Sequence, residues 1–429
     1  MSLDKDAVRV YPSTRGNSRG SSTALHAQGP GPAGPPGPRL GNTRISFPAS
    51  SPRAERWALR DTLHGVSALE RVRKCGKVPI ANVALRSGSR GESPGYAGLS
   101  TCGSVWACPV CAAKIAAERR TEVAAVVDHA IATGMTVSLL TLTQRHHRGQ
   151  DLGDLWNALS YGWNKVTSGR RWQGFKEQLG LIGTVRSVEV THGKHGWHVH
   201  THVLVVSEKD PSVTPIFWQR KQGRRRTPYP VEVQTSAEFV AERWAAGLAS
   251  HGVDFVKDRG GLDWEIARDG HAAGRYVAKL GGAAEGEAQG AKIANETTLG
   301  AFKRARGENR TPFQILSDFA ATGDVDDLRL WNIWEKKSKG RRALLWSQGL
   351  REWAKLGKER SDEEIAEDER GDEVIAIFTN EAWRQLRQGG GAATLLDVVE
   401  SGGPRAGLFW LNRHKIPYSL PPAEESAEE

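Results

Sequence analysis

The middle of the chain carries three apolar stretches with the character of β-strands. Residues 135–143 (MTVSLLTLT) form a short run rich in β-branched and aliphatic side chains, which predicts a buried strand. Residues 181–191 (LIGTVRSVEVT) and 197–206 (WHVHTHVLVV) have strand character too, and the glycine-containing segment 192–196 (HGKHG) joins them. This arrangement predicts an antiparallel hairpin.

Helical patterns alternate with these strands. Residues 151–166 place leucine, tryptophan and valine side chains on one face at helical spacing. A second helix is expected from Thr235, which has capping-box spacing to Glu238. Residues 252–266 are expected to supply another strand, and 270–282 a short helix that ends at two glycines. The order β-α-β-β-α-β followed by a helix predicts an α+β fold of the split βαβ, ferredoxin-like type with a central antiparallel sheet.

Composition divides the rest of the chain. Residues 1–60 are rich in Gly, Pro, Ser and Arg and cannot bury much apolar surface, so a disordered basic tail is expected there. Segments 311–319 and 330–350 look helical. The expected domains are the tail at 1–60, a cysteine-bearing zinc module at 61–120, the central α+β domain at 121–285, a helical extension at 286–355, an acidic linker at 356–373 and a small C-terminal unit of unknown role at 374–429.

The charge balance points to a polyanionic partner. The chain of 429 residues carries 59 Lys and Arg against 49 Asp and Glu, a formal net charge of +10. The positive charge is dense in residues 220–230 (RKQGRRRTPYP), whereas residues 361–373 are acidic. The basic segment suits phosphate contact, although a solvated surface loop would have the same composition. Its candidate DNA-binding residues are Arg220, Lys221, Arg224, Arg225 and Arg226.

The sequence also bears on the cellular compartment. No apolar run approaches the ~20 residues that span a bilayer, and the first residues lack the apolar core of a signal peptide. We therefore expect a cytoplasmic protein without a membrane partner. In that compartment the four cysteines stay reduced, so metal binding is a better expectation than disulfides.

Three histidines alternate along the second strand of the expected hairpin. Because alternate strand residues share a face, His198, His200 and His202 project to one side. Two such imidazoles can bind one divalent ion; a solvent-facing strand that happens to carry histidine is the alternative. Glu189 is expected opposite His200 and is the best third ligand, with His198 or a water as competitor. These ligands with open positions suit Mg²⁺ or Mn²⁺ beside phosphate, and by chemistry alone also Zn²⁺.

All four cysteines fall in one short part of the chain. Cys108 and Cys111 form a Cys-Pro-Val-Cys knuckle at the start of a helix-like run, and Cys102 and Cys75 precede it. Four thiolates make a closed tetrahedral site for a structural Zn²⁺; buried free cysteines with a coincidental knuckle are the alternative. The basic residues that flank the cysteines are expected to help hold DNA, namely Arg71, Arg73, Lys74, Lys114 and Arg119.

The short helix expected at 270–282 brings two reactive side chains to one face. Tyr276 and Lys279 lie one helical turn apart. A tyrosine can attack phosphorus and hold a covalent phosphotyrosyl intermediate, and an ammonium can neutralise developing negative charge. The spacing alone is unspecific. The spacing becomes more informative because, in the split βαβ fold, the helix that carries Tyr276 is expected to pack across the sheet that carries the histidines.

Three of these segments together resemble the motifs of the HUH endonucleases: a strand ending TLT, the histidine strand WHVHTHVLV and the later YVAK. More closely, the chain resembles the replication initiators of rolling-circle plasmids from Gram-positive bacteria, particularly actinomycetes. The segments WACPVCAAK, RTPFQILSDF and GRRALLWSQGL are also similar to that family, so the resemblance runs from about residue 70 to about residue 350.

The resemblance implies residue roles and an activity. His200 and His202 match the ion-binding pair, Tyr276 the nucleophile with Lys279 beside it, and the cysteines a zinc-binding portion. The implied enzyme is a site-specific DNA endonuclease and strand transferase. It would nick double-stranded origin DNA at an extruded single strand, form a 5′-phosphotyrosyl bond and leave a 3′-OH primer. Host helicase and DNA polymerase are the implied partners.

The sequence departs from this family at one position. Some relatives carry a glutamate one helical turn before the tyrosine, where this chain has Ala272. Asp263, Glu265 and Asp269 lack that spacing, so the residue for the termination step is left open while the nicking step is unaffected. The alternatives are a transposase or mobilisation relaxase with the same motifs, a non-catalytic zinc-containing DNA-binding regulator, and a zinc hydrolase that uses water.

Overall fold

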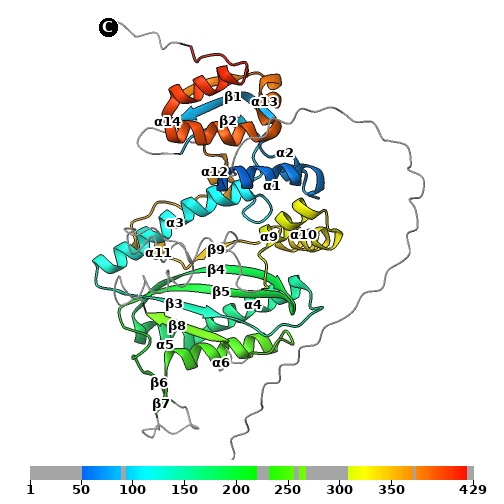
Figure 1. The fold of residues 1–429 in the computed structure, drawn as a ribbon. Coiled ribbons are helices and arrows are strands. Elements are labelled where there is room, and N and C mark those ends of the chain that lie inside the picture. The colour runs from blue at the N-terminus through cyan, green and yellow to red at the C-terminus, as the bar shows by residue number, and fades with distance from the viewer. Residues whose placement is uncertain are drawn as a thin grey trace, which may run out of the picture. The chain divides into compact units, whose positions relative to one another are not determined.

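A five-stranded antiparallel sheet forms the centre of the described chain (Figure 1). The computed structural model describes residues 51–87, 93–219, 231–255, 260–266, 308–369, 371 and 373–422. Across the sheet the strands follow the order β8-β3-β5-β4-β9, and all neighbouring strands are antiparallel. Their bounds are β3 Thr136–Leu142, β4 Leu181–Gly193, β5 Gly196–Ser207, β8 Leu262–Ile266 and β9 Leu344–Trp346.

The elements follow one another along the chain in the order β-α-β-β-α-β. Strand β3 leads to helix α4 (Leu152–Val166), the hairpin β4–β5 comes next, and helix α6 (Ser236–Ala249) leads to β8. Helix α5 (Gly169–Leu179) and a ribbon of β6 (Ile216–Gln219) and β7 (Val231–Gln234) are inserted into this order. The mixed α+β class expected from the sequence is confirmed.

The two faces of the central sheet pack against different helices. On one face Val203 of β5 shares a buried core with Trp244 of α6. On the other face Leu204 packs with the helix α3 (Pro109–Ala132). Because alternate residues of β5 share a face, His202 lies on the side of Leu204 and not on that of Val203. The predicted separation of the histidines from the core valines is therefore confirmed.

The sequence explains where α4 and α6 begin and how closely they pack. Asp151 accepts hydrogen bonds from the first turn of α4, and Thr235 with Glu238 forms the predicted capping box of α6. A Cβ added at Gly247 of α6 would lie 2.7 Å from the Cα of Gly162 in α4. The two glycines thus allow the helix backbones to approach, and any larger side chain there would push the helices apart.

A second, three-stranded sheet joins segments from opposite ends of the described chain, in the order β10-β1-β2. Strand β1 (Pro79–Ser87) pairs with both β2 (Gly95–Leu99) and β10 (Glu373–Phe378). Helices α13 (Asn380–Arg387) and α14 (Gly391–Arg413) bury a separate apolar core against this sheet. The C-terminal segment therefore folds against the cysteine-bearing segment, a pairing that no sequence pattern predicted.

The structure differs from the expected disordered tail over residues 52–60. Helix α1 (Pro52–Val66) begins there, with Ser51 as N-cap and a proline in its first turn. It buries Leu63 and the side chain of Arg60, so its stability comes from packing that composition alone does not reveal.

A second difference concerns residues 330–350, which were expected to be helical. Helix α10 (Val325–Ser338) ends within this segment, and β9 then pairs with the edge of β4 before α11 (Leu350–Trp353) begins. Hydrogen bonding to a sheet edge thus overrides the local helical pattern.

The remaining elements are α2 Glu70–Lys74, α9 Pro312–Thr322, α12 Asp362–Glu367 and the 3₁₀ turn η3 Gln388–Gly390. Within the described ranges, every helix is too short or too polar to cross a membrane.

Candidate metal centres

The hairpin β4–β5 carries the first cluster of potential ligands. Its register pairs Glu189 with His200 and Ser187 with His202. Glu189 Oε2 lies 3.4 Å from His200 Nε2 and 3.3 Å from His202 Nε2. One ligand atom from each of these three side chains lies within 4.8 Å of the other two. The predicted pairing of Glu189 with His200 is confirmed, and the three side chains could bind a metal ion together.

Thr141 of β3 orients the more deeply buried imidazole of this cluster. Its Oγ1 lies 3.0 Å from Nδ1 of His202, whose side chain is almost fully buried. When Nδ1 carries the proton and donates it to Thr141, Nε2 keeps its lone pair for a cation. Such a hydrogen bond fixes the ring orientation and the tautomer that a metal site requires.

The neighbouring imidazoles stabilise the charge of Glu189. Burial raises the pKa of this carboxyl group, but hydrogen bonds to His200 and His202 and their charge interactions outweigh burial. The pKa of Glu189 is therefore held well below its usual range. An ionised carboxylate between two imidazole nitrogens is a suitable ligand set for a divalent cation.

His198 has a different environment from the other two histidines. Its ring stacks between those of His146 and His200, and its centroid lies 4.8 Å from each. Burial, together with the two neighbouring imidazoles, lowers the pKa of His198 to about 3, so the side chain is neutral near pH 7. His198 is not part of the group formed by Glu189, His200 and His202. This favours a supporting contact from His198 to His200 over a role for His198 as a metal ligand.

Two of the acidic residues considered for the missing glutamate lie on the same face of the sheet as this cluster. Asp263 of β8 pairs with Thr141, which in turn pairs with His202. Glu265 pairs with Leu139 one step further along the same strands. The third, Asp269, lies outside the described residues. A carboxylate is thus available two strands from the histidines, at a position that spacing along the chain did not suggest.

The second cluster consists of the four cysteines, all buried and none in a disulfide. Their sulfur atoms lie within 4.8 Å of one another, with Cys111 Sγ 3.5 Å from Cys75 Sγ and 3.6 Å from Cys102 Sγ. Zinc–sulfur bonds of ~2.3 Å in a tetrahedron would give about the same separation. Burial raises the pKa of Cys108, whereas hydrogen bonds from neighbouring thiols lower that of Cys111. The cluster could hold one metal ion through four sulfur ligands.

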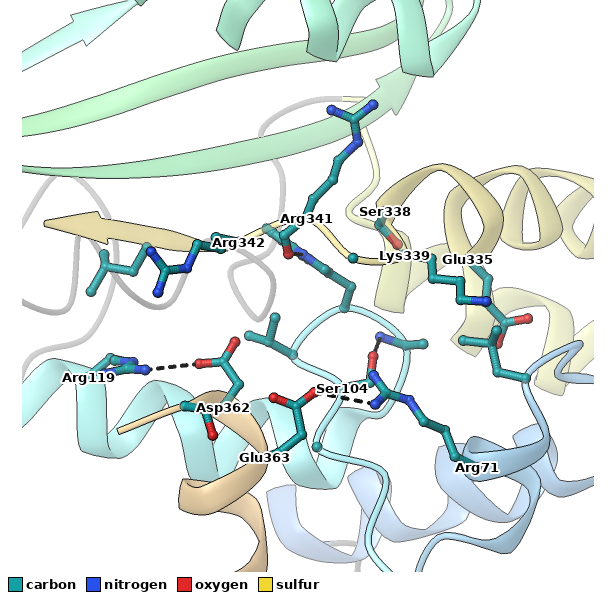
Figure 2. Close-up of a pocket in the computed structure, with 18 of the residues that line it drawn as sticks. Arg71, Ser104, Arg119, Glu335, Ser338, Lys339, Arg341, Arg342, Asp362 and Glu363 are labelled. Atoms are coloured by element: carbon teal, nitrogen blue, oxygen red, sulfur yellow. Dashed lines mark hydrogen bonds and ion pairs between the residues drawn. The ribbon is translucent and has the colours of Figure 1, made fainter. Parts of the chain in front are cut away.

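Two of the basic residues around the cysteines pair with carboxylates of helix α12. In the cavity that Figure 2 shows, Arg71 lies 3.3 Å from a carboxylate oxygen of Glu363 and Arg119 lies 3.2 Å from one of Asp362. Lys114 donates hydrogen bonds to two backbone carbonyls of the same acidic segment. Helix α12 therefore pairs with two of the positive charges that the sequence suggested would face DNA, those of Arg71 and Arg119.

Several predicted site residues lie outside the described residues: Tyr276, Lys279, Ala272, Arg220, Lys221, Arg224, Arg225 and Arg226.

Sequence reasoning missed two contributors to the histidine face, Thr141 and His146. Thr141 had a signal, because it belongs to the strand that ends TLT and has an outward position in the alternation. His146 follows that strand in a segment without periodicity, so no pattern identified it.

Comparison with known proteins supports the resemblance seen in the motifs. Residues 97–211 match a family described as "Replication protein", and this range includes both the histidine hairpin and three of the cysteines. The chain is 28% identical to "Protein rep" of Streptomyces lividans over 369 residues, which cover 72% of this chain and 76% of that protein. It is also 30% identical over 134 residues to a protein named "Neomycin resistance protein" of Streptomyces cyanogenus, covering 25% of this chain and 31% of that protein.

No solved structure matches the chain significantly. The sequence matches therefore carry the assignment, and the longer of them extends over most of both proteins. The predicted resemblance is confirmed: this chain is similar to an actinomycete replication protein over most of its length.

Proposed function

We propose that the protein initiates rolling-circle replication of a plasmid by nicking origin DNA at a specific site. The observation that carries this proposal is the cluster of Glu189, His200 and His202, which lies on the central sheet within the part of the chain that matches replication proteins. Two imidazoles and one carboxylate leave coordination positions free, as a site that acts on phosphate requires.

In this proposal the cluster holds Mg²⁺ or Mn²⁺. The ion would act as a Lewis acid that polarises the scissile phosphate. Glu189 would supply the negative charge, and its low pKa would keep it ionised at any physiological pH. Thr141 would hold His202 in the tautomer that leaves Nε2 free, and His198 would support His200 by stacking.

Tyr276 is the proposed nucleophile. Its phenolate oxygen would attack phosphorus, the bond from phosphorus to the 3′ oxygen would break, and the leaving oxygen would take a proton to become a 3′-OH. The 5′ phosphate would then be linked to Tyr276, and Lys279 would neutralise charge that develops on the phosphate. The 3′-OH would prime a host polymerase behind a host helicase, and a later strand transfer would release the tyrosine.

The four cysteines would hold a structural Zn²⁺ in this proposal. An all-thiolate tetrahedral site has no position for substrate, so its role would be to fix the end of α2, the segment that follows β2 and the start of α3 to one another. The basic segment at 220–230 is proposed to contact DNA.

Formation of a covalent adduct separates this function from its rivals. Wild type, Tyr276→Phe and the control Tyr161→Phe would be incubated with Mn²⁺ and supercoiled DNA that carries the plasmid origin, then analysed on denaturing gels. Tyr161 is a matched control because it is a partly exposed tyrosine whose ring contacts His251. We expect nicked DNA and a nuclease-sensitive adduct with wild type and Tyr161→Phe, and neither with Tyr276→Phe.

The other outcomes identify the alternatives. Nicking by Tyr276→Phe without an adduct would mean that the ion activates water, as in a hydrolase. Binding without nicking by any protein, at an origin cleaved in the host, would favour a non-catalytic regulator. Cleavage at a transfer origin or a transposon end in place of the replication origin would favour a relaxase or a transposase.

A further inference from the structure

A cavity of about 520 Å³ lies beside the cysteine cluster, between helices α1 and α3 and strand β2. One face of α1 lines it with Arg53, Arg56, Trp57 and Arg60, which follow one another at helical spacing. The volume falls within the range of sites that bind a small molecule or one unit of a polymer. The cavity is separate from the histidine cluster, and the nicking chemistry makes no use of it.

Arg60 is the unusual residue of this cavity. Its side chain lines the cavity although it is only 2% exposed, and its Nε and Nη2 atoms have no hydrogen-bond partner among the described residues. The guanidinium carbon lies 3.9 Å from the ring centroid of Trp57, a cation–π contact that leaves these donors unused. A buried guanidinium with unsatisfied donors is costly unless an anion completes its hydrogen bonds.

The backbone next to the cysteines makes room for this arginine. Gly76 directly follows Cys75 and has a φ of +62°, and a Cβ there would lie 2.1 Å from Nη1 of Arg60. His64, one turn after Arg60 on α1, lies with Nε2 2.9 Å from the carbonyl oxygen of Cys75. The position of Arg60 is thus tied to the backbone of the cysteine cluster.

Cationic side chains outnumber carboxylates in the lining of the cavity. Its lining contains five cationic side chains, those of Arg53, Arg56, Arg60, Lys114 and Arg120, and one carboxylate, that of Asp368. Arg53 is paired with Asp397 and Glu400 just outside the lining. Burial and the neighbouring Arg53 lower the pKa of Arg56, and the charges of Asp397 and Glu55 offset this only in part.

The cavity of Figure 2, which is lined in part by residues 103–107 between two of the cysteines, has a different charge balance. Its lining contains five cationic side chains and four carboxylates, and ion pairs such as Arg71–Glu363 and Arg119–Asp362 join them. An anion entering that cavity would have to displace a carboxylate. Even with Asp397 and Glu400, which pair with Arg53, the cavity at Arg60 has fewer carboxylates than cations, and neither Arg56 nor Arg60 forms an ion pair among the described residues, so this cavity is the better suited to an anionic ligand.

Aromatic side chains add a second feature of nucleic-acid sites. Tyr96 packs edge-on against Trp57, with ring centroids 5.8 Å apart, and its hydroxyl donates to the backbone oxygen of Ala392. The hydroxyl is therefore engaged, and both aromatic residues line the cavity beside the arginines. Cationic groups that follow a backbone, next to aromatic rings, are typical of proteins that bind single strands.

We propose that this cavity binds a phosphate group of single-stranded DNA, with Arg60 and Arg56 as its main ligands. Naming DNA as the source rests on the proposed function. The phosphate chemistry itself would also suit a free nucleotide. On this view the cysteine cluster has a use beyond stability, because it fixes the backbone that positions Arg60.

The test measures DNA binding separately from cleavage. Full-length protein in a Tyr276→Phe background would be titrated into a fluorescein-labelled single-stranded oligonucleotide from the origin, without added divalent ion, at several NaCl concentrations. We expect Arg56→Ala to weaken binding about tenfold, the usual effect of losing a charge-assisted hydrogen bond. The plot of log affinity against log salt should become shallower by about 0.7, the value for one phosphate contact on a single strand.

Controls make the result decisive. Arg329→Ala removes an exposed arginine of α10 that pairs only locally with Asp326, and it should change neither affinity nor slope. Arg60→Met should reproduce Arg56→Ala; if it fails to fold, Arg56→Ala decides alone. Unchanged affinity and slope in Arg56→Ala would overturn the proposal. The proposal would also be overturned if Arg56→Ala lost binding to dAMP but still bound the oligonucleotide normally. The cavity would then be a site for a free nucleotide. The test measures binding without cleavage. A protein that binds DNA through Arg56 but never nicks it would therefore refute the proposed function and leave the proposed phosphate site standing.

Discussion

The two clusters of potential metal ligands differ in how many ligands they offer and in what holds them. Four cysteines, each at most 5% exposed, surround one point with sulfur on all sides. Glu189, His200 and His202 meet at another point, but with three ligands and a partly exposed carboxylate. Four thiolates complete a tetrahedron, whereas three mixed ligands leave room for substrate oxygens.

The scaffold of each cluster differs as well. The cysteines come from the end of α2, the turn before α3 and α3 itself, and none of them lies in a strand. The histidine cluster lies on two long strands inside a five-stranded sheet. We infer that an ion at the cysteines is needed for the local fold. The histidine site is formed by the sheet itself, so an ion can bind there and dissociate reversibly.

The largest effect should follow from breaking the closed cluster. Cys108→Ser removes one thiolate of a fully buried set, so the site loses its ion and three thiols remain buried without it. We expect bound zinc to disappear and the protein to lose about 4 kcal/mol of unfolding free energy or more. Zinc analysis by mass spectrometry and thermal unfolding by circular dichroism would measure both quantities.

A matched control separates metal loss from the introduction of a hydroxyl. Ala112→Ser adds the same buried hydroxyl in the next turn of α3, at a residue that is 1% exposed, while it keeps all four thiols. It should retain zinc and lose only ~1–3 kcal/mol. If Cys108→Ser kept its zinc and unfolded like this control, the four cysteines would be ordinary buried thiols.

Breaking the open cluster should affect ion binding and leave the fold intact. His200→Ala removes one of two imidazoles from the Glu189 group, and we expect Mn²⁺ affinity measured by calorimetry to fall more than about 100-fold. The unfolding free energy should change by less than about 1 kcal/mol, because the β-ladder is unaffected. His198→Ala is the matched control, since it removes an imidazole from the same strand face but outside the cluster. Equal losses in both variants would show that the row of histidines has no defined ligand set.

The smallest effect should come from the residue that orients His202. Thr141→Val keeps the shape of the side chain and removes the hydroxyl 3.0 Å from Nδ1 of His202. The imidazole would remain but could rotate or change tautomer, so we expect Mn²⁺ affinity to fall about tenfold with little change in stability. Thr136→Val at the start of the same strand is the control, because Thr136 pairs with Ser207 far from the cluster. An unchanged affinity in Thr141→Val would mean that sheet packing alone orients His202.

The sequence by itself determined the histidine site to a large extent. Alternation along β5 separated the histidines from the valines, and the short turn of the hairpin placed Glu189 opposite His200. These are local properties, because the two-residue period and the turn length together set the register of neighbouring strands. The capping box at Thr235 and Glu238 and the helical spacing of α4 were predicted for the same reason.

Only the tertiary structure decided which distant segments meet. Three contacts join residues far apart in the sequence: the pairing of β10 with β1, the addition of β9 to the edge of β4, and the docking of acidic α12 on the arginines of the cysteine region. Periodicity describes one segment and carries no information on its partner. The unbalanced charge at Arg60 was hidden for the same reason, because it depends on which carboxylates pack nearby and not on how many the chain contains.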